Sequence, residues 1–408
     1  MAQPARRAVP VDDIIIVDNI KTELLMNDHS VPLPPPQKTA GLPTLRWVLP
    51  VITLSWTLLL SVLVMAAVRI QRWELAPGAA MAVSPRIGFS PIAEGESVPQ
   101  RFTAENGIRF VTAYGGQLSI LDSVVGWIDP YVQVNTYKEQ FGERTPTSSR
   151  RLGYQAMFGA KQIAEYVAMK KLGLDAKFSE GDIVIEELVC EGAPRENSAC
   201  SVLEVGDTIT AVNGTKTPTL SALLKVLPTF TVGQKVKVTV LPYAPPGSAS
   251  TEPEVRTVEV MASPDEADRP IIGFIPADTR VVNLPFEVGI STPDIGGPSA
   301  GLAFTLSLLD ELTKGELMGK NKVAATGTIN ELGAVGAIGA LVQKAIAVRD
   351  AGMTLFLIPA GQSDEEVRQA RAAVGDGVEI VKVASLDEAL KVLRARGGDP
   401  LPSRITMD

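Results

Sequence analysis

The chain has 408 residues, which is enough for two or three domains, and a formal net charge of −8. This acidic balance argues against a general nucleic-acid-binding role, because no broad cationic surface is implied and no dense basic run occurs. Apolar residues make up 45% of the chain, partly because of one uncharged segment near the N-terminus.

Residues 1–46 form a polar tail of mixed charge that contains His29, the single histidine of the chain. The tail ends in VPLPPPQKTAGLP, a proline-rich stretch that favours an extended polyproline-like backbone. We expect this tail to be mostly disordered, because of its mixed charge and its proline-rich end.

Residues 47–69 are predicted to form a transmembrane helix. The 22 residues from Trp47 to Val68 carry no charge, and a helix that crosses the hydrocarbon core needs about 20 such residues. Trp47 and Trp73 are expected near the two membrane interfaces. A buried core helix of this length would have a polar face. A cleaved signal peptide would have a shorter apolar region nearer the N-terminus, although Ala-Met-Ala at 80–82 resembles a cleavage site.

Residues 70–173 are predicted to form a connecting β/α region. Apolar and polar residues alternate over 101–130, a pattern that favours strands. The segment 148–173 has apolar residues at spacings of three and four, which predicts a helix.

Residues 174–262 are predicted to form a compact β-rich module. The sequence GDTITAVNG at 206–214 matches the pattern GDxIxxVNG of PDZ domains, and Asn-Gly within it suits a turn with positive φ. The module therefore resembles a PDZ domain, a fold that captures chain ends by adding a strand to an exposed sheet edge. The pattern marks the fold more than a ligand.

The chain has two cysteines, Cys190 and Cys200, in the loop-like stretch CEGAPRENSAC. In a non-cytosolic domain such a pair can form a disulfide, and elsewhere the two would be free thiols. The spacing is not typical of a zinc site and no histidine is near, so we expect no metal site.

Residues 268–395 are predicted to form the last domain, after a boundary in SPDEADRP, and 396–408 a C-terminal tail. Helices and strands interleave within it. The predicted helices are 301–313, 340–352, 363–374 and 385–396, and the predicted strands are 322–329, 354–360 and 378–384.

The stretch DIGGPSAG at 294–301 contains G-x-S-x-G around Ser299. That spacing can mark a nucleophilic serine on a tight turn, or simply a serine that starts a helix. A Ser-His-Asp triad, and with it an α/β-hydrolase esterase, is nearly excluded, because His29 lies far upstream beyond the apolar segment.

Without histidine, the base for Ser299 would have to be a lysine with a depressed pKa, and burial is what lowers a lysine pKa. Lys344 lies beside an apolar stripe formed by Ile338, Leu341 and Val348 at helical spacing. The alternative is a lysine that extends its charge to water along an apolar surface.

The last domain resembles the proteolytic domain of Lon-type proteases, which use a Ser-Lys dyad. GGPSAG matches the nucleophile position, and ATGTINELGAVGAIGALVQKAIA matches the segment that carries the lysine. LFLIPAGQSDE matches the strand and loop that follow, and Gly339-Ala340 replaces the usual Gly-Gly.

The order of an apolar anchor, a PDZ-like module and a Lon-type domain resembles the membrane-anchored PDZ–Lon peptidases of bacteria. The resemblance implies a multi-domain α/β protein with a transmembrane helix, a β-rich PDZ-like domain and an α+β Lon-type domain. It also implies a single-pass protein of the cell membrane, with residues 1–46 cytoplasmic and the C-terminal domains extracytoplasmic, a location compatible with a Cys190–Cys200 disulfide.

The resemblance implies that Ser299 attacks a peptide carbonyl and that Lys344 takes its proton. Backbone N–H groups near the serine would hold the oxyanion, and Thr326 and Asp294 would support the site. The loop residues assigned to substrate and oxyanion are Gly296, Gly297, Ala300 and Gly301.

The sequence contains no G-x-x-x-x-G-K-[ST], so we expect no ATP-driven unfolding and no cofactor. The predicted function is an ATP-independent serine endopeptidase that cleaves peptides or unfolded and exposed protein segments, with the PDZ-like module binding substrate or controlling access. The alternative is a non-catalytic surface adaptor with an inactive Lon-like domain. Oligomerisation is possible in either case.

Overall fold

The computed structural model describes residues 45–93, 98–142, 144–190, 195–244, 251–266, 269–402 and 405. The predicted disordered tail lies outside these residues, apart from its last two positions, and so does His29. The chain separates into two units, 1–59 and 60–408, each described by itself.

The first helix, α1 (Leu45–Ala67), contains residues 47–67 of the predicted transmembrane segment, whose last residue, Arg69, instead begins strand β1. Within it, Val48–Ala67 is long and apolar enough to cross a membrane, by length and composition alone. The prediction for Trp73 was wrong. It lies in strand β1, is only 9% exposed, and makes edge-on ring contacts with Tyr137 and Phe141 at 5.5 and 5.0 Å. The chain becomes a strand at Arg69, and alternation along that strand turns Trp73 inward.

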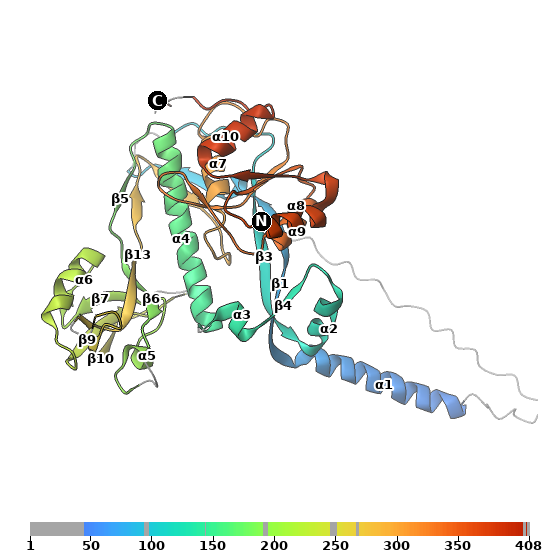
Figure 1. The fold of residues 1–408 in the computed structure, drawn as a ribbon, viewed down its shortest axis with the longest axis horizontal. Coiled ribbons are helices and arrows are strands. Elements are labelled where there is room, and N and C mark those ends of the chain that lie inside the picture. The colour runs from blue at the N-terminus through green and yellow to red at the C-terminus, as the bar shows by residue number, and fades with distance from the viewer. Residues whose placement is uncertain are drawn as a thin grey trace, which may run out of the picture. The chain divides into compact units, whose positions relative to one another are not determined.

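A six-stranded sheet forms the centre of the C-terminal domain, in the order β20-β19-β16-β3-β1-β4. Its strands are β1 (Arg69–Ala82), β3 (Arg109–Ser119), β4 (Gln133–Thr136), β16 (Val323–Ala325), β19 (Leu355–Pro359) and β20 (Glu379–Val383). β3, β16, β19 and β20 are parallel, whereas β1 is antiparallel to both of its neighbours. Figure 1 shows β1 and β3, coloured blue and cyan, beside the red C-terminal elements.

The 70–173 segment is therefore more than a connector, because its strands complete the sheet of the C-terminal domain. Its helix prediction over 148–173 is confirmed by α4 (Pro146–Lys171). The strand prediction over 101–130 holds for β3 and fails for α2 (Ile120–Ile128). There Ser119 and Asp122 form reciprocal backbone-to-side-chain hydrogen bonds of 3.1 Å, which start a helix where alternation alone favours a strand.

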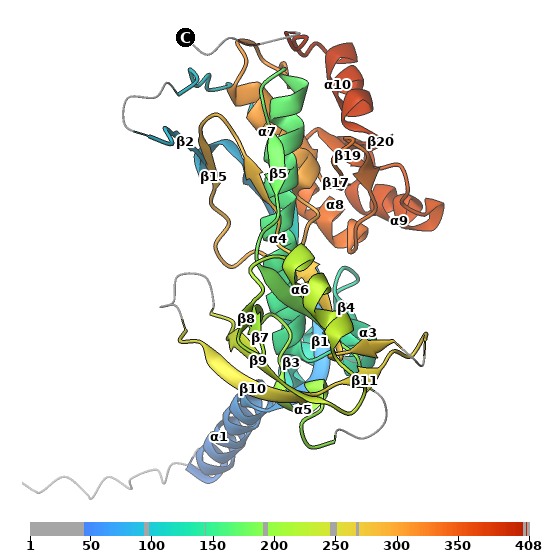
Figure 2. The same cartoon turned by 90° about the vertical axis from the view of Figure 1, so that its left-hand side faces the viewer.

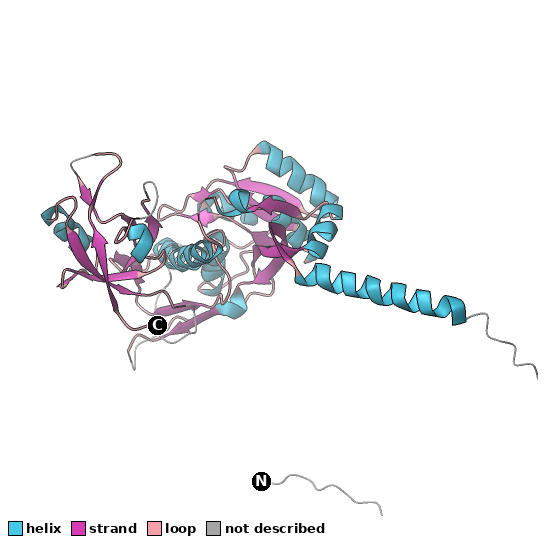
Figure 3. Cartoon of the chain, turned by 90° about the horizontal axis from the view of Figure 1, so that it is seen from below, coloured by secondary structure: helices cyan, strands magenta, loops and turns pink. Residues whose placement is uncertain are grey.

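Helices cover both faces of the sheet, and strand alternation decides which core each residue joins. Phe110 packs against Phe304 of α7 on one face, with ring centroids 5.5 Å apart, while its neighbour Val111 belongs to the core of the other face. Helices α4, α7 (Gly301–Glu311) and α10 (Leu386–Ala395) contribute to the first core, and α8 (Leu341–Asp350) and α9 (Asp364–Val374) to the second. Figure 3 shows the cyan helices around the magenta strands.

A second sheet, in the order β10-β9-β7-β6-β13, forms the PDZ-like module (Figure 2). Its elements are β6 (Ile183–Leu188), α5 (Ala199–Val202), β7 (Thr208–Val212), β8 (Thr215–Lys216), α6 (Leu220–Val226), β9 (Lys235–Leu241), β10 (Glu254–Glu259) and β13 (Phe274–Asp278). β13 lies beyond the predicted boundary at 262. Part of SPDEADRP instead connects the paired strands β11 (Met261–Ala262) and β12 (Pro270–Ile271), because turn residues also close hairpins.

Short elements complete the described chain. They are η1 (Ser84–Arg86), α3 (Tyr137–Phe141), η2 (Leu227–Thr229), η3 (Gly375–Gly377), and the pairs β2 (Ile87–Ser90) with β15 (Glu287–Ile290), β5 (Lys177–Ser179) with β14 (Val281–Asn283), and β17 (Thr328–Ile329) with β18 (Val335–Gly336).

Candidate active site

Ser299 lies in the turn that leads into α7, and the residues after β16 hold its backbone in place. The N–H of Gly327 donates to the carbonyl oxygen of Ser299 at 2.8 Å, and the hydroxyl of Thr326 donates to the same oxygen at 3.1 Å. The serine is thus fixed at the carboxyl end of a parallel strand, the edge where α/β sheets usually present functional groups.

The glycine pair before the serine packs directly on the backbone of α4. The N–H of Gly297 donates to the carbonyl oxygen of Gly153 at 2.7 Å. A Cβ atom on Gly296 would lie 3.0 Å from the carbonyl carbon of Gly153, and Gly297 has a φ of +94°. Position 296 therefore requires glycine because the loop approaches the backbone of α4 closely, and position 297 favours glycine because its φ is positive. Sequence reasoning missed Gly153, although a lone glycine inside a helical pattern is a signal of close packing.

Lys344 reaches Ser299 from α8, which belongs to the other face of the sheet. The side-chain Nζ of Lys344 lies 2.9 Å from the Oγ of Ser299. Lys344 is only 5% exposed, and this burial lowers the pKa of its ammonium group from 10.5 to about 8. At neutral pH a useful fraction of the amine is therefore free to accept a proton.

The start of α8 sets the position of the lysine. Ala340 lies at the N-cap in the left-handed conformation, with φ 58° and ψ 40°, and its carbonyl oxygen accepts the N–H of Lys344 at 3.0 Å. The N–H of Ile338 donates to the side-chain oxygen of Gln362 at 2.8 Å, and Gln362 is buried. Sequence reasoning did not find Gln362, because its partner is a backbone group 24 residues away.

Ser299 and Lys344 line an open cleft with a volume of about 950 Å³. Its walls come from β1, β3, the loop before α7 and the loop before α8. The charged residues among those that line it are Arg86, Asp294 and Lys344. A cleft of this size, with a mostly uncharged lining, can hold several residues of an extended peptide.

The four predicted oxyanion residues divide into two pairs. The N–H groups of Gly297 and Gly301 are engaged, since they donate to the carbonyl oxygens of Gly153 and Pro298 at 2.7 and 3.2 Å. In the described part of the chain, no hydrogen bond uses the N–H of Gly296 or of Ala300, nor that of Ser299, which was not among the predicted residues. The N–H groups of Ser299 and Ala300, at and directly after the nucleophile position, are the candidates to hold a negatively charged oxygen.

The two predicted support residues lie near the serine in different ways. Thr326 is fully buried and its hydroxyl bonds to the backbone of Ser299 instead of to Lys344. Asp294 is exposed on the rim of the cleft, with a φ of 60°.

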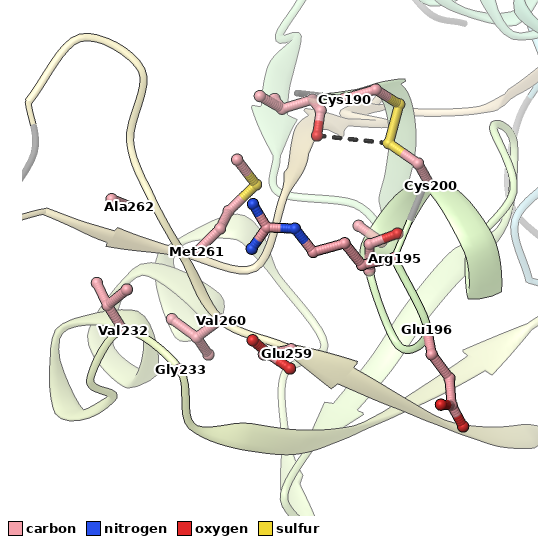
Figure 4. A pocket seen from close by; sticks show the side chains of 13 residues that line it. Cys190, Arg195, Glu196, Cys200, Val232, Gly233, Glu259, Val260, Met261 and Ala262 are labelled. Atoms are coloured by element: carbon pink, nitrogen blue, oxygen red, sulfur yellow. Dashed lines mark hydrogen bonds between the residues drawn. A yellow bond between two sulfur atoms is a disulfide. The ribbon is translucent and has the colours of Figure 1, made fainter. Parts of the chain in front are cut away.

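Cys190 and Cys200 are joined by a disulfide in the PDZ-like module, with Cα atoms 5.9 Å apart. They border a separate cavity of about 310 Å³, whose lining includes Arg195, Glu259 and Met261, as Figure 4 shows. Across the described ranges, no group of three or more His, Cys, Asp or Glu side chains is placed to hold a metal ion.

Comparisons with known proteins match the region around the cleft. Residues 287–395 match the model of the Lon protease (S16) C-terminal proteolytic domain. The Lon protease of Trichlorobacter lovleyi is 38% identical over 106 residues, which cover 26% of this chain and 13% of that protein. The Lon protease of Xanthomonas oryzae pv. oryzae is 38% identical over 114 residues, which cover 27% of this chain and 13% of that protein.

Two solved structures are similar to about a quarter of the chain. The PDZ domain of an SdrC-like protein of Listeria monocytogenes has 19% identity and a TM-score of 0.18, covering 24% of this chain and 90% of that one. The second domain of a Listeria protein has the same identity and TM-score, with 87% of that chain covered. The family match shows that residues 287–395 are a Lon-type proteolytic domain, and this homology supports a serine peptidase.

Proposed function

We propose that this protein is a membrane-anchored, ATP-independent serine endopeptidase with a dyad of Ser299 and Lys344. The observation that carries the proposal is the 2.9 Å approach of the Lys344 Nζ to the Ser299 Oγ, combined with the burial that lowers the lysine pKa to about 8. In the molecules in which this buried amine is deprotonated, it is a general base in reach of its nucleophile.

In the proposed mechanism, neutral Lys344 accepts the hydroxyl proton while the Oγ of Ser299 bonds to the substrate carbonyl carbon. The carbonyl oxygen becomes an oxyanion, which the N–H groups of Ser299 and Ala300 stabilise. Collapse of this intermediate breaks the peptide C–N bond, and the ammonium of Lys344 gives its proton to the leaving amine. A water molecule, deprotonated by Lys344, then hydrolyses the acyl-enzyme ester and regenerates the hydroxyl of Ser299.

The expected substrates are short peptides, exposed loops or chains that are already unfolded. The sequence has no phosphate-binding P-loop, so it offers no ATP-driven means of pulling a folded protein apart. The PDZ-like module is proposed to bind substrate or to control access to the cleft. Strand β13 ends the order of that sheet, and such an edge can pair with an extended peptide.

The proposed location is the cell membrane, with one crossing and the C-terminal domains outside the cytoplasm. The apolar length of Val48–Ala67 supports the crossing. The Cys190–Cys200 disulfide supports the side, because disulfides persist in oxidising compartments.

The experiment that tests the dyad is cleavage of casein by the full chain in detergent or lipid vesicles, without ATP. Ser299→Ala and Lys344→Ala are expected to abolish cleavage. Lys391→Ala is the matched control, because Lys391 is an exposed lysine on α10, and it should cleave like the unaltered chain. Equal cleavage by all four proteins would show that a contaminating protease or another site is responsible.

The adaptor alternative predicts a different result with a reagent specific for active-site serines. A catalytic Ser299 should carry a covalent adduct that mass spectrometry locates on its peptide, and Lys344→Ala should prevent the adduct. An unmodified Ser299 in a folded chain that also fails to cleave casein would favour the adaptor.

A further inference from the structure

Helix α2 presents an exposed apolar face. Val124, Trp127 and Ile128 are 49%, 87% and 73% exposed. Their spacing of three and four places them on one side of the helix. A cluster of apolar side chains this exposed is typical of a surface that contacts a membrane or another protein.

The orientation of this face is fixed by the packing of the rest of α2. Gly126, on the opposite side, is buried, and a Cβ atom there would lie 3.3 Å from side-chain atoms of both Val132 and Val134. Ser119 and Asp122 cap the start of the helix through reciprocal hydrogen bonds. Because α2 is held by its opposite side and its first turn, it cannot rotate to bury Trp127.

The helix lies beside the point where the chain leaves the apolar span. The N–H of Ile120 donates to the carbonyl oxygen of Val68 at 3.1 Å, and Val68 directly follows Ala67, the last residue of the span. Arg69 pairs with Ser119 in the sheet, and both Arg69 and Arg72 are exposed. A guanidinium nitrogen of Arg69 lies 3.4 Å from the carboxylate of Asp122 on α2, so part of its charge is balanced within the protein. Two arginines and a tryptophan thus lie near the end of the span, and Arg72 is the cation of the two that has no carboxylate partner among the ion pairs of the described residues.

We infer that α2 is a second membrane contact, whose apolar face inserts among the lipid headgroups of the leaflet from which the catalytic region emerges. This inference rests on the membrane-anchored location proposed above. Tryptophan favours the headgroup level because its ring is apolar and its N–H is polar. Short amphipathic helices bind there through apolar burial, and nearby arginines add attraction to lipid phosphates.

Seating α2 in the lipid would also position the active-site cleft. α2 directly follows β3, and residues 110–114 of β3 line the cleft. A catalytic sheet attached to the bilayer by both the span and α2 would have its cleft held at one distance from the membrane. The substrates in reach would be chains or loops that emerge close to the lipid surface.

The test uses the full chain in phosphatidylcholine–phosphatidylglycerol vesicles and the fluorescence of Trp127. Trp47→Phe and Trp56→Phe remove two of the four tryptophans, and subtracting the spectrum of the same protein with Trp127→Phe removes the contribution of buried Trp73. We expect brominated lipids to quench the Trp127 signal. We also expect acrylamide to quench it at least about threefold less than it quenches N-acetyltryptophanamide, as for a headgroup-level tryptophan.

A second protein separates this inference from the location on which it rests. It carries Trp47→Phe and Trp127→Phe, and subtracting the spectrum of the same protein with Trp56→Phe removes the contribution of Trp73, so that the difference reports Trp56, within the span. If brominated lipid quenches Trp56 while only acrylamide quenches Trp127, the membrane anchor proposed above would be supported. The inference that α2 contacts the membrane would be overturned. If neither tryptophan responds to lipid, both fail. Protection of Trp127 from acrylamide without lipid quenching would mean that protein, such as a second copy, covers the face, and would also overturn it.

Discussion

The PDZ-like module and the catalytic domain each bury a charged group, and they treat it in opposite ways. In the PDZ-like module the Asp207 side chain is 1% exposed, and a guanidinium nitrogen of Arg256 lies 2.8 Å from its carboxylate. The backbone N–H groups of Tyr243 and Glu204 also donate to this carboxylate, at 3.1 and 3.2 Å. In the catalytic domain Lys344 is about as deeply buried, but burial is the only cause that shifts its pKa.

The difference distinguishes a structural charge from a reactive one. Burial raises the pKa of Asp207 as well, but the hydrogen bond from Tyr243 and the charge of Arg256 act against that rise. A buried ion with such partners can keep its charge and fix the fold around it. A buried amine without a counter-charge tends to lose its proton, which makes it a base and makes it costly to the fold. Asp207 belongs to the sequence pattern that marks the PDZ-like fold, and Lys344 to the pattern that marks the proteolytic domain.

The largest effect is expected from removing the reactive charge. Lys344→Met should lower kcat/KM for a peptide at least about 10³-fold, as loss of a general base does in related dyads and triads. The same change should stabilise the catalytic domain by roughly 1–3 kcal/mol at pH 7. Peptide cleavage and urea unfolding measure the two effects.

The sign of the stability change follows from the lysine pKa, which folding lowers from 10.5 to about 8. Well below pH 8 the amine is protonated in both states, so the folded protein carries the full penalty for burying the charge. The penalty disappears as the pH rises from about 8 to 10.5, because the unfolded state then holds more protons. A Lys344→Met protein that loses both activity and stability at pH 7 would contradict this account.

The next largest effect is expected from breaking the paired charge. Arg256→Met leaves Asp207 buried without its cation and should destabilise the PDZ-like module by about 3–5 kcal/mol. Glu266→Gln in the same module is the control, because Glu266 and its partner Arg269 are both exposed, and it should change stability by less than about 1 kcal/mol. Urea unfolding followed by circular dichroism measures both, and equal midpoints for the two variants would refute the prediction.

A smaller effect is expected from titrating the reactive charge instead of removing it. With a Lys344 pKa of about 8, cleavage of a short peptide should fall about tenfold for each pH unit below that value and level off above it. The measurement is kcat/KM against pH at constant ionic strength. A rate that stays level between about pH 6 and 8 would mean that another group, or another step, limits the reaction.

The smallest effect concerns the backbone that supports the lysine. Ala340 has a φ of 58°, a conformation that costs a non-glycine residue roughly 1–2 kcal/mol. Ala340→Gly should therefore stabilise the chain by up to about 1 kcal/mol, after the greater freedom of glycine in the unfolded state is subtracted. Ala372→Gly, at an exposed position inside α9, should destabilise by about 1 kcal/mol. Thermal unfolding should separate the two by sign.

The sequence was most informative where the determinants are local. Each predicted helix of the last domain is present, and Ser363 and Ser385 cap two of them through hydrogen bonds to backbone N–H groups. The apolar stripe beside Lys344 did not predict its burial, because the same spacing favours a lysine that extends its charge to water, and it was the resemblance to Lon-type proteases that indicated a buried base. The 2.9 Å contact between Lys344 and Ser299 requires the start of α8 to lie beside the loop before α7, and no local sequence pattern predicts that arrangement.

The determinants that sequence reasoning missed are contacts between distant segments. β16 pairs with β3 through Ala324 and Arg109, and the sequence of neither strand indicates which strand it pairs with. Gly153 and Gln362 act through backbone groups of other elements, so their residue types carry little signal. At α2 the capping pair outweighed the alternating pattern, because a few specific hydrogen bonds at a helix start decide between two weak preferences.

The placement of β3 beside β16 has a consequence for the order of events during synthesis. The PDZ-like module separates these two strands in the chain, so β1 and β3 leave the ribosome more than 200 residues before β16 pairs with them. Pairings this distant in sequence form late, after the intervening module has had time to fold. Ser299, Lys344 and the cleft can therefore come together only after the α8 segment has been made. A growing chain that ends before this segment lacks the proposed dyad, so β1, β3 and the PDZ-like module are synthesised before the proposed peptidase could act on them.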